Sequence, residues 1–189
     1  MSSILLSGPA VEPLSLDDAK AFLKVETSDD DDVIAALIAG ARIHVEAQTR
    51  RALVTQSWRL IRDAWPADGV PILPAPLRSV SAVRVYRFDG STQTIDSGSY
   101  DSDLSAAPAV LWFKTPPPAP GRVVAGIEID IIAGYGDTAA DVPADLRQAI
   151  RLLVAHWYEN RGMIAAGQTV GLLPASVNAT LAPYRVLSL

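Results

Sequence analysis

Residues whose side chains could perform catalysis or bind a metal ion are few in this chain. Its 189 residues include two histidines and no cysteine, which excludes a cysteine nucleophile, a disulfide and a thiolate zinc site. Glu159 follows His156 by three positions and Gln48 follows His44 by four, a spacing that brings two side chains to one helix face. A single such pair falls short of a ligand set. We therefore expect no metal, no cofactor and no enzyme, and keep a hydrolase or metal enzyme using His156 and Glu159 as the third hypothesis.

Two further groups could bind a ligand or a partner. The aspartate run 29–32 lacks the alternating ligands, central glycine and closing glutamate of a calcium loop, so it indicates the solvated start of a helix. Arg147 and Arg151 lie one helical turn apart and could hold a carboxylate or phosphate of a partner, or form a solvated helix face. Ala39 and Gly40 would allow a helix of this chain, or of another copy, to approach closely. These four residues are the candidate subunit-interface residues.

The tryptophans are the remaining candidates for binding. Trp58, Trp65, Trp112 and Trp157 have little basic charge around them, so they favour core or interface anchors over platforms for nucleobases. The alternative function for the chain is a module that binds a soluble partner or carbohydrate through Trp58, Trp65 or Trp112.

Composition limits the class of protein. Hydrophobic residues make up 49% of the chain, so a sizeable core is expected. A net charge of −5 argues against a dedicated nucleic-acid-binding module. The sequence has no apolar run of transmembrane length, and its N-terminus does not resemble a signal peptide. No role in a membrane is expected.

The elements that must position these residues follow from hydrophobic periodicity. Residues 141–162 predict an amphipathic helix with apolar residues at helical spacing, and residues 30–49 predict the longest helix. Ser15 is typical of an N-cap for a short helix that begins beside it. Between the long helices the period becomes alternating, and prolines separate the short strands that it predicts. The predicted strands cover residues 56–62, 80–88, 92–95, 110–113 and 127–132.

The predicted fold class is α+β, a helical bundle of two long helices plus short helices, with an antiparallel β module inserted between the long ones. Residues 1–13 are expected to form a flexible lead-in. Residues 14–51 and 141–162 would form the helical core, and residues 52–140 the inserted β module. Residues 163–189 would form a loop, a short helix and an apolar docking tail.

Several short motifs follow one another along nearly the whole chain. They are Leu14–Lys24, Val33–Arg42, Glu46–Leu53, Gln56–Trp58, Ala133–Asp137, Val142–Ile150, Tyr158–Arg161 and Pro183–Arg185. Each motif is weak alone, but their shared order resembles the head-tail connector, or adaptor, proteins of tailed bacteriophages and phage-derived gene transfer agents.

The resemblance implies a non-enzymatic virion protein of the particle neck, assembled in the bacterial cytoplasm. Copies would form a homo-oligomeric ring, plausibly twelve-fold, between the portal and the stopper and tail proteins. DNA would pass through the ring without specific binding, as the acidic charge balance also favours. In the family the C-terminal end reaches the portal, which implies that Tyr184, Arg185, Val186 and Leu187 dock on it.

Overall fold

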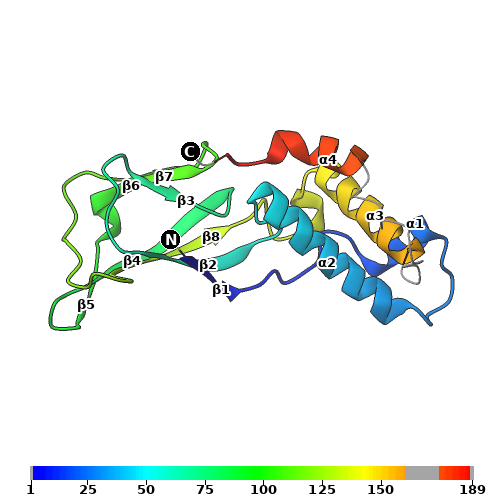
Figure 1. Ribbon diagram of the computed structural model, residues 1–189, viewed down its shortest axis with the longest axis horizontal. Coiled ribbons are helices and arrows are strands. Elements are labelled where there is room, and N and C mark those ends of the chain that lie inside the picture. The colour runs from blue at the N-terminus through cyan, green and yellow to red at the C-terminus, as the bar shows by residue number, and fades with distance from the viewer. Residues whose placement is uncertain (1, 161–174, 188–189) are drawn as a thin grey trace, which may run out of the picture. The chain divides into compact units, whose positions relative to one another are not determined.

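The computed structural model describes residues 2–160 and 175–187, and the chain divides into two compact units (Figure 1). The β unit contains Met1–Ala10, Thr55–Tyr135 and Val186–Leu189. The helical unit contains Val11–Val54 and Gly136–Arg185. Each unit is therefore assembled from segments that are far apart in the sequence.

The larger sheet of the β unit has five antiparallel strands in the order β1-β2-β8-β4-β5. The strands are β1 (Ser2–Ser7), β2 (Gln56–Arg62), β4 (Leu77–Tyr86), β5 (Thr92–Thr94) and β8 (Ile127–Ala133). β8 alternates buried isoleucines with acidic residues along Ile127-Glu128-Ile129-Asp130-Ile131, so one face is apolar and the other polar. This pattern explains why β8 is the central strand, since it pairs along its whole length with both β2 and β4.

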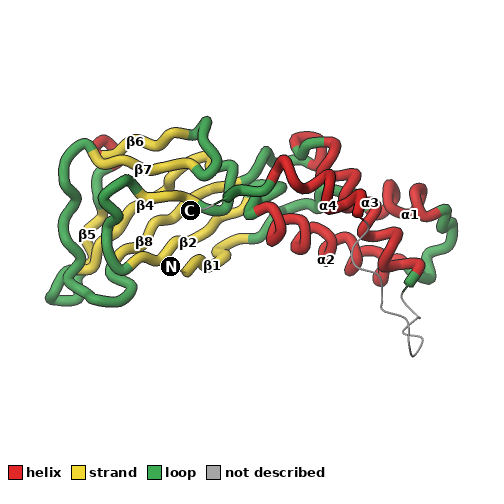
Figure 2. Tube along the Cα trace, turned by 45° about the horizontal axis from the view of Figure 1, so that its top comes forward, coloured by secondary structure: helices red, strands yellow, loops and turns green. Residues whose placement is uncertain are grey.

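A smaller sheet of three strands lies over one face of the larger sheet (Figures 1 and 2). Its order is β3-β7-β6, with β3 (Val70–Ile72), β6 (Tyr100–Asp103) and β7 (Ala109–Phe113), and the short 3-10 helix Ser97–Ser99 precedes β6. The buried side chains of both sheets form one core, and full burial of an isoleucine side chain contributes about 2–3 kcal/mol. The fully buried side chains include Leu60, Ile72, Val83, Leu111, Ile127 and Ile129.

The described residues of the helical unit form four α-helices, of which α2 and α3 run side by side (Figure 1). The helices are α1 (Leu16–Leu23), α2 (Asp31–Thr49), α3 (Ala144–Glu159) and α4 (Ala175–Leu181), with 3-10 turns at Ala139–Asp141 and Ala182–Tyr184. Ser15 caps α1 as predicted, because its hydroxyl accepts a hydrogen bond from the Asp18 amide at 3.1 Å. Apolar residues at helical spacing on α2 and α3, such as Ile38, Val45, Ile150 and Leu153, are buried.

The turn before α3 depends on a close backbone approach. Gly136 lies against Asp141 so closely that a Cβ at position 136 would meet the aspartate side chain. The Asp141 carboxylate accepts hydrogen bonds from the amide and the hydroxyl of Thr138, both at 2.8 Å, and these bonds lower the pKa of Asp141. This capping box begins the 3-10 turn Ala139–Asp141, which precedes α3.

The predicted fold class is wrong in its arrangement. The structure has helices of moderate length and two antiparallel sheets with eight strands among the described residues, rather than a two-helix bundle with an inserted β module. The sheet begins with β1, which precedes every helix, so the β unit is not an insertion. The sequence predicts a flexible lead-in over residues 1–13, whereas Ser2–Ser7 form a strand.

Most strands inside the β unit agree with their predicted positions, with three omissions. β2 has the predicted bounds, and the strands predicted over residues 80–88 and 127–132 appear as Leu77–Tyr86 and Ile127–Ala133. β1, β3 and β6 were not predicted. β3 contains Pro71 and β6 contains two aspartates. Neither strand therefore shows the alternation of apolar and polar residues that predicts a strand. The predicted helix end at residues 161–162 and the loop at 163–173 lie outside the described residues.

Candidate functional site

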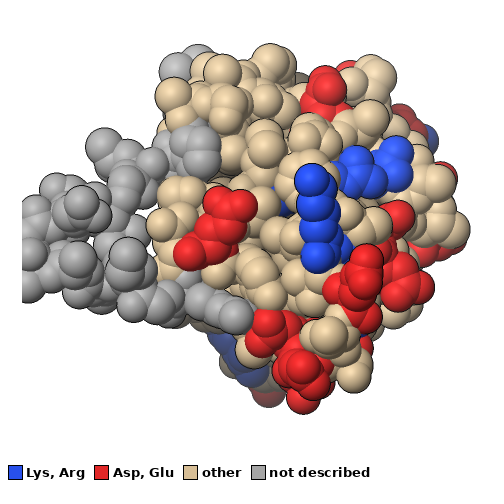
Figure 3. All heavy atoms as spheres, turned by 90° about the vertical axis from the view of Figure 1, so that its right-hand side faces the viewer, with Lys and Arg blue, Asp and Glu red and all other residues tan. Residues whose placement is uncertain are grey.

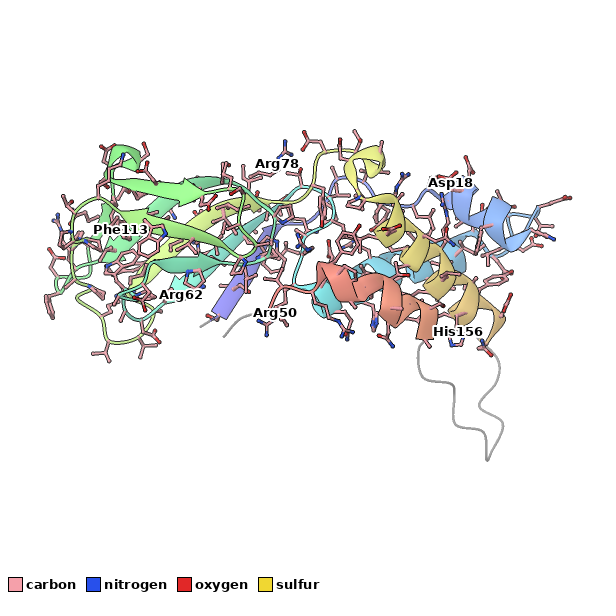
Figure 4. The ribbon with its side chains drawn as sticks, turned by 90° about the horizontal axis from the view of Figure 1, so that it is seen from above. Asp18, Arg50, Arg62, Arg78, Phe113 and His156 are labelled. Carbon is pink, nitrogen blue, oxygen red and sulfur yellow. The ribbon has the colours of Figure 1, made fainter. Side chains whose placement is uncertain are left out.

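The two histidines do not belong to a cluster of metal-ligating side chains among the described residues. Among residues 2–160 and 175–187, no group of three or more His, Asp and Glu side chains converges on a point that could hold a metal ion. His44 packs edge-on against Trp157, with ring centroids 6.0 Å apart. His156 lies near the end of α3 (Figure 4), where the Asn160 side-chain amide donates to its carbonyl oxygen at 2.7 Å. Both histidines therefore have local packing or capping contacts.

The aspartate run joins helices together. Asp31 accepts a hydrogen bond and ion pair from Lys20 of α1 at 2.6 Å. Asp30 accepts a hydrogen bond from the Tyr158 hydroxyl of α3 at 2.5 Å. Figure 3 shows the end of the helical unit, where acidic side chains gather with a few basic ones between them. The run therefore begins α2, as predicted, and also ties that helix to α1 and α3.

The four predicted subunit-interface residues lie on the two long helices of the helical unit. A Cβ added to Gly40 would lie 3.6 Å from the Trp157 ring, an ordinary contact distance, so Gly40 faces α3 within one copy of the chain and its position has room for a methyl group. Ala39, Arg147 and Arg151 are half-buried. Arg147 has a buried Nε atom with no hydrogen-bond partner. A contact of these residues with a second copy stays a prediction.

The C-terminal segment is attached to the helical unit before its last described residues. Arg51 Nε donates to the Tyr184 carbonyl oxygen at 2.7 Å, and the Tyr184 hydroxyl donates to Asp145 at 3.3 Å. Burial, with the nearby Asp145 charge, raises the pKa of Tyr184. Arg185 donates to the Asn178 side chain at 3.4 Å. These bonds attach the backbone of Tyr184 and the side chains of Tyr184 and Arg185 to the helical unit.

Exposure divides that segment into anchored and open residues. Val186 is buried, Tyr184 is half-buried, and Leu187 is 83% exposed. Among the four predicted docking residues, Leu187 therefore presents the largest free apolar surface to a partner. No helix among the described residues is both long and apolar enough to cross a membrane.

The tryptophans proposed for a binding module have different surroundings. Trp65 Nε1 donates to the Pro118 carbonyl oxygen at 2.9 Å. The Trp65 ring packs edge-on against the Phe113 ring, with the two ring centroids 4.8 Å apart. Trp58 Nε1 donates to the Gln56 side chain at 3.1 Å. Trp112 is half exposed, above the backbone of Gly69, in a groove of about 380 Å³. Trp65 also lines this groove, so the binding-module hypothesis depends chiefly on Trp112 and Trp65.

The polar face of the five-stranded sheet carries an ionic network. Asp130 of β8 accepts hydrogen bonds from Arg59 of β2 at 2.7 and 2.9 Å, and from Arg84 of β4 at 2.6 Å. These bonds, of which those from Arg59 have the largest effect, hold the pKa of Asp130 below its ordinary value, although burial alone would raise it. Glu128 accepts a hydrogen bond from the Tyr86 hydroxyl at 2.9 Å, and the Arg122 guanidinium lies over that ring at 3.8 Å. The network joins β2, β8 and β4 across the sheet.

Arg62 contrasts with that network, because its side chain is buried without a carboxylate. It lies within the β unit (Figure 4) and donates to the carbonyl oxygens of Ile61 and Ser2 at 2.9 and 3.4 Å. Its Nε atom has no partner, and desolvation lowers its pKa. Since Ser2 belongs to β1, this arginine helps to hold the first strand on the sheet.

Sequence reasoning missed β1, one of the two outer strands of the larger sheet. All six of its residues are exposed, and Ile4, Leu5 and Leu6 are each about half exposed. It pairs with β2 through the register Ser2↔Ile61 to Ser7↔Ser57, with an irregularity between Leu5 and Ser7. The signal in the sequence was a short, uncharged apolar run beside serines, which is too brief for period analysis.

The comparisons with known proteins agree with one another. A family model described as "Head completion protein" matches residues 12–187. The chain resembles a solved chain from the "Neck of empty GTA particle computed with C6 symmetry", at 25% identity and TM-score 0.83, covering 100% of this chain and 97% of that one. It also resembles a chain from the "Neck of native GTA particle computed with C12 symmetry", at 27% identity and TM-score 0.70, covering 98% and 97%. No curated protein matches the chain.

A third solved chain shares the fold. It comes from the "Virion of native gene transfer agent (GTA) particle", with 22% identity and TM-score 0.83, covering 100% of this chain and 97% of that one.

Proposed function

Because the chain belongs to the head completion protein family, we propose that it is a structural, non-enzymatic component of the neck of a phage-like or gene transfer agent particle. Copies of it would form a ring between the portal and the stopper and tail proteins, around the channel through which DNA leaves. The observation that carries the proposal is the likeness, along almost its whole length, to chains from gene transfer agent necks.

Ring formation is supported by the symmetry named for those necks. Their titles give six-fold and twelve-fold cyclic symmetry. A cyclic ring requires each copy to present two different surfaces that bind each other, so that the contact repeats by rotation until it closes. The copy number in this protein's own ring would follow from that rotation.

The charge balance supports free passage of DNA. The net charge of −5 would repel phosphates, so a channel wall built from this chain would not hold DNA as it moves. Acidic side chains gather at the end of the helical unit that Figure 3 shows.

Docking on the portal is assigned to the C-terminal segment, with Leu187 as its apolar contact. Its support is the 83% exposure of Leu187 immediately after residues that are hydrogen-bonded to the helical unit. An exposed leucine at the end of an anchored segment can enter a partner's pocket at a small entropic cost.

Negative-stain microscopy of the full chain mixed with its particle's portal protein tests the proposal. We expect rings seated on the portal. A Leu187→Asp variant should lose them, whereas Phe88→Asp, at a side chain 93% exposed in the β unit, should keep them. A wild-type chain that forms no ring on the portal would overturn the proposed function. Rings that persist with Leu187→Asp would remove only the assigned docking contact.

A further inference from the structure

We propose that strand β1 is a docking edge, along which an extended segment of a second copy of this chain adds to the five-stranded sheet. The inference rests on the proposed ring and names a surface through which its copies join. It would give the ring a contact made of backbone hydrogen bonds, which is the usual basis of binding by strand addition.

β1 has the composition of a strand that is meant to be covered. One edge of β1 pairs with β2, and the other is an outer edge of the sheet. Ile4, Leu5 and Leu6 are 49%, 47% and 48% exposed, and Ser2–Ser7 contains no charged residue and no proline. Proteins normally protect such an edge, because its unpaired amides and carbonyls are a template for another strand.

The other three sheet edges of the β unit are protected. β5, at the far edge of the same sheet, has only three residues, Thr-Gln-Thr. β3 also has three residues and contains Pro71, which cannot donate a backbone hydrogen bond. β6 carries Asp101 and Asp103, both exposed. A short strand, a proline and a charged side chain are three usual means of blocking strand addition. β1 has none of these three, and its one irregularity, between Leu5 and Ser7, is in its pairing with β2.

A second copy of the chain is the occupant that fits. β1 contains no charged residue, as is typical of the buried core of an interface. It therefore suits a contact that stays covered once the ring is assembled. The neck chains that this protein resembles are arranged with cyclic symmetry, which requires an unlike pair of surfaces on each copy. β1 must therefore pair with a different segment of its neighbour, because β1 pairing with β1 would close at a dimer.

The first part of the test introduces a lysine into β1. Ile4→Lys should weaken self-association of the full chain by at least about tenfold, because the new charge would have to be buried in the added sheet. In the free protein the lysine can reach water from this half-exposed position, so the fold should persist. The matched control is Thr92→Lys on β5, which adds the same charge to the protected edge of the same sheet and should change association less than twofold.

Cross-linking identifies the occupant directly and does not depend on a destabilising change. Since the chain has no cysteine, a Ser3→Cys variant carries a single thiol on β1, to which a photo-activated cross-linker can be attached. Cross-linking assembled rings and sequencing the products by mass spectrometry should join residue 3 to a segment of this chain other than residues 2–7.

Each outcome decides the inference. Wild-type rings without that cross-link, or with cross-links only to the portal or between two copies of β1, would overturn it and leave the proposed neck function intact. Equal association of wild type and a folded Ile4→Lys variant would also overturn it. A wild-type chain that does not self-associate, alone or with the portal, would overturn both proposals.

Discussion

The two outer strands of the five-stranded sheet, β1 and β5, have the same structural position but opposite chemistry. β1 has six residues with three half-exposed aliphatic side chains, and β5 has three polar residues. Both are held by one antiparallel neighbour, so the stability of the sheet alone does not demand this difference. One edge of the sheet is short and polar and the other is longer, uncharged and apolar, which is the pattern expected if the second edge is a surface for a partner.

The largest expected effect comes from making β1 resemble the protected edges. Replacing both Ile4 and Leu6 with lysine should weaken self-association about a hundredfold, roughly 2.7 kcal/mol. Two charged side chains would then lie beside those of the added strand. Analytical ultracentrifugation of the full chain gives the association constant. Circular dichroism spectra that match wild type would show that the sheet remains folded.

A double substitution on β5 is the control for that change. Thr92→Lys with Thr94→Lys adds the same charge to the other edge of the sheet. If this control lost association to the same extent, then net charge rather than the β1 edge would explain the result, and the comparison between the two strands would fail.

The next effect separates docking at β1 from the stability of the sheet beneath it. Ile4 is the register partner of Arg59, which donates two hydrogen bonds to Asp130. An Asp130→Asn change should lower the free energy of unfolding of the β unit by about 2 kcal/mol at pH 7, because two arginines lose their buried anion. Urea unfolding followed by tryptophan fluorescence measures the change.

The pH dependence of that stability has a definite sign. The pKa of Asp130 is lowered in the folded protein, so its contribution is complete above the unfolded value of about 3.9 and is lost as pH falls through the folded pKa. Wild type should therefore lose more stability than Asp130→Asn below about pH 4. Equal acid sensitivity of the two proteins would show that the network does not stabilise the sheet through this carboxylate.

Where periodicity was strong, the sequence predicted the elements well. The isoleucines of β8 and the apolar stripes of α2 and α3 repeat over several turns or pleats, and the structure buries them. What the sequence could not supply was the arrangement. The chain enters the sheet through Ser2–Ser7 before it forms any helix, and a six-residue strand with every side chain exposed has no buried face to produce a period.

The candidate site shows the same limit. The sequence predicts Gly40 as a small residue that permits close approach, and in the structure this residue faces Trp157 of α3, with a contact to a second copy still a prediction. Spacing along one helix cannot tell whether the neighbour belongs to the same chain. The portal-docking segment came from a family resemblance, and only the structure distinguishes its buried Val186 from its exposed Leu187.

A smaller effect should follow from removing the protection of another edge. Replacing Asp101 and Asp103 of β6 with threonine removes both charges and retains side chains that suit a strand. We expect self-association to strengthen by about fivefold to tenfold, since β6 has four residues where β1 has six. Sedimentation velocity at constant ionic strength detects the gain. No gain would mean that these aspartates do not protect the edge.

Acid should not mimic that double substitution at ordinary pH. Hydrogen bonds from the Ser105 hydroxyl and amide lower the pKa of Asp103, so its charge is lost only as pH falls below the ordinary aspartate value of about 3.9. Wild-type association through β6 should therefore be absent between pH 7 and about pH 5. An increase in that range which Asp103→Thr abolishes would contradict this account.

The smallest expected effect tests whether length alone can protect an edge. Replacing Thr92 and Thr94 with valine gives β5 an apolar, uncharged sequence like that of β1 but leaves it three residues long. Self-association should change less than about twofold, because so short a strand offers few backbone hydrogen bonds and little apolar area to a neighbour. Valine has a strand propensity similar to that of threonine, so the sheet should keep its stability. Association as strong as that of β1 would show that polarity, rather than length, keeps β5 unpaired.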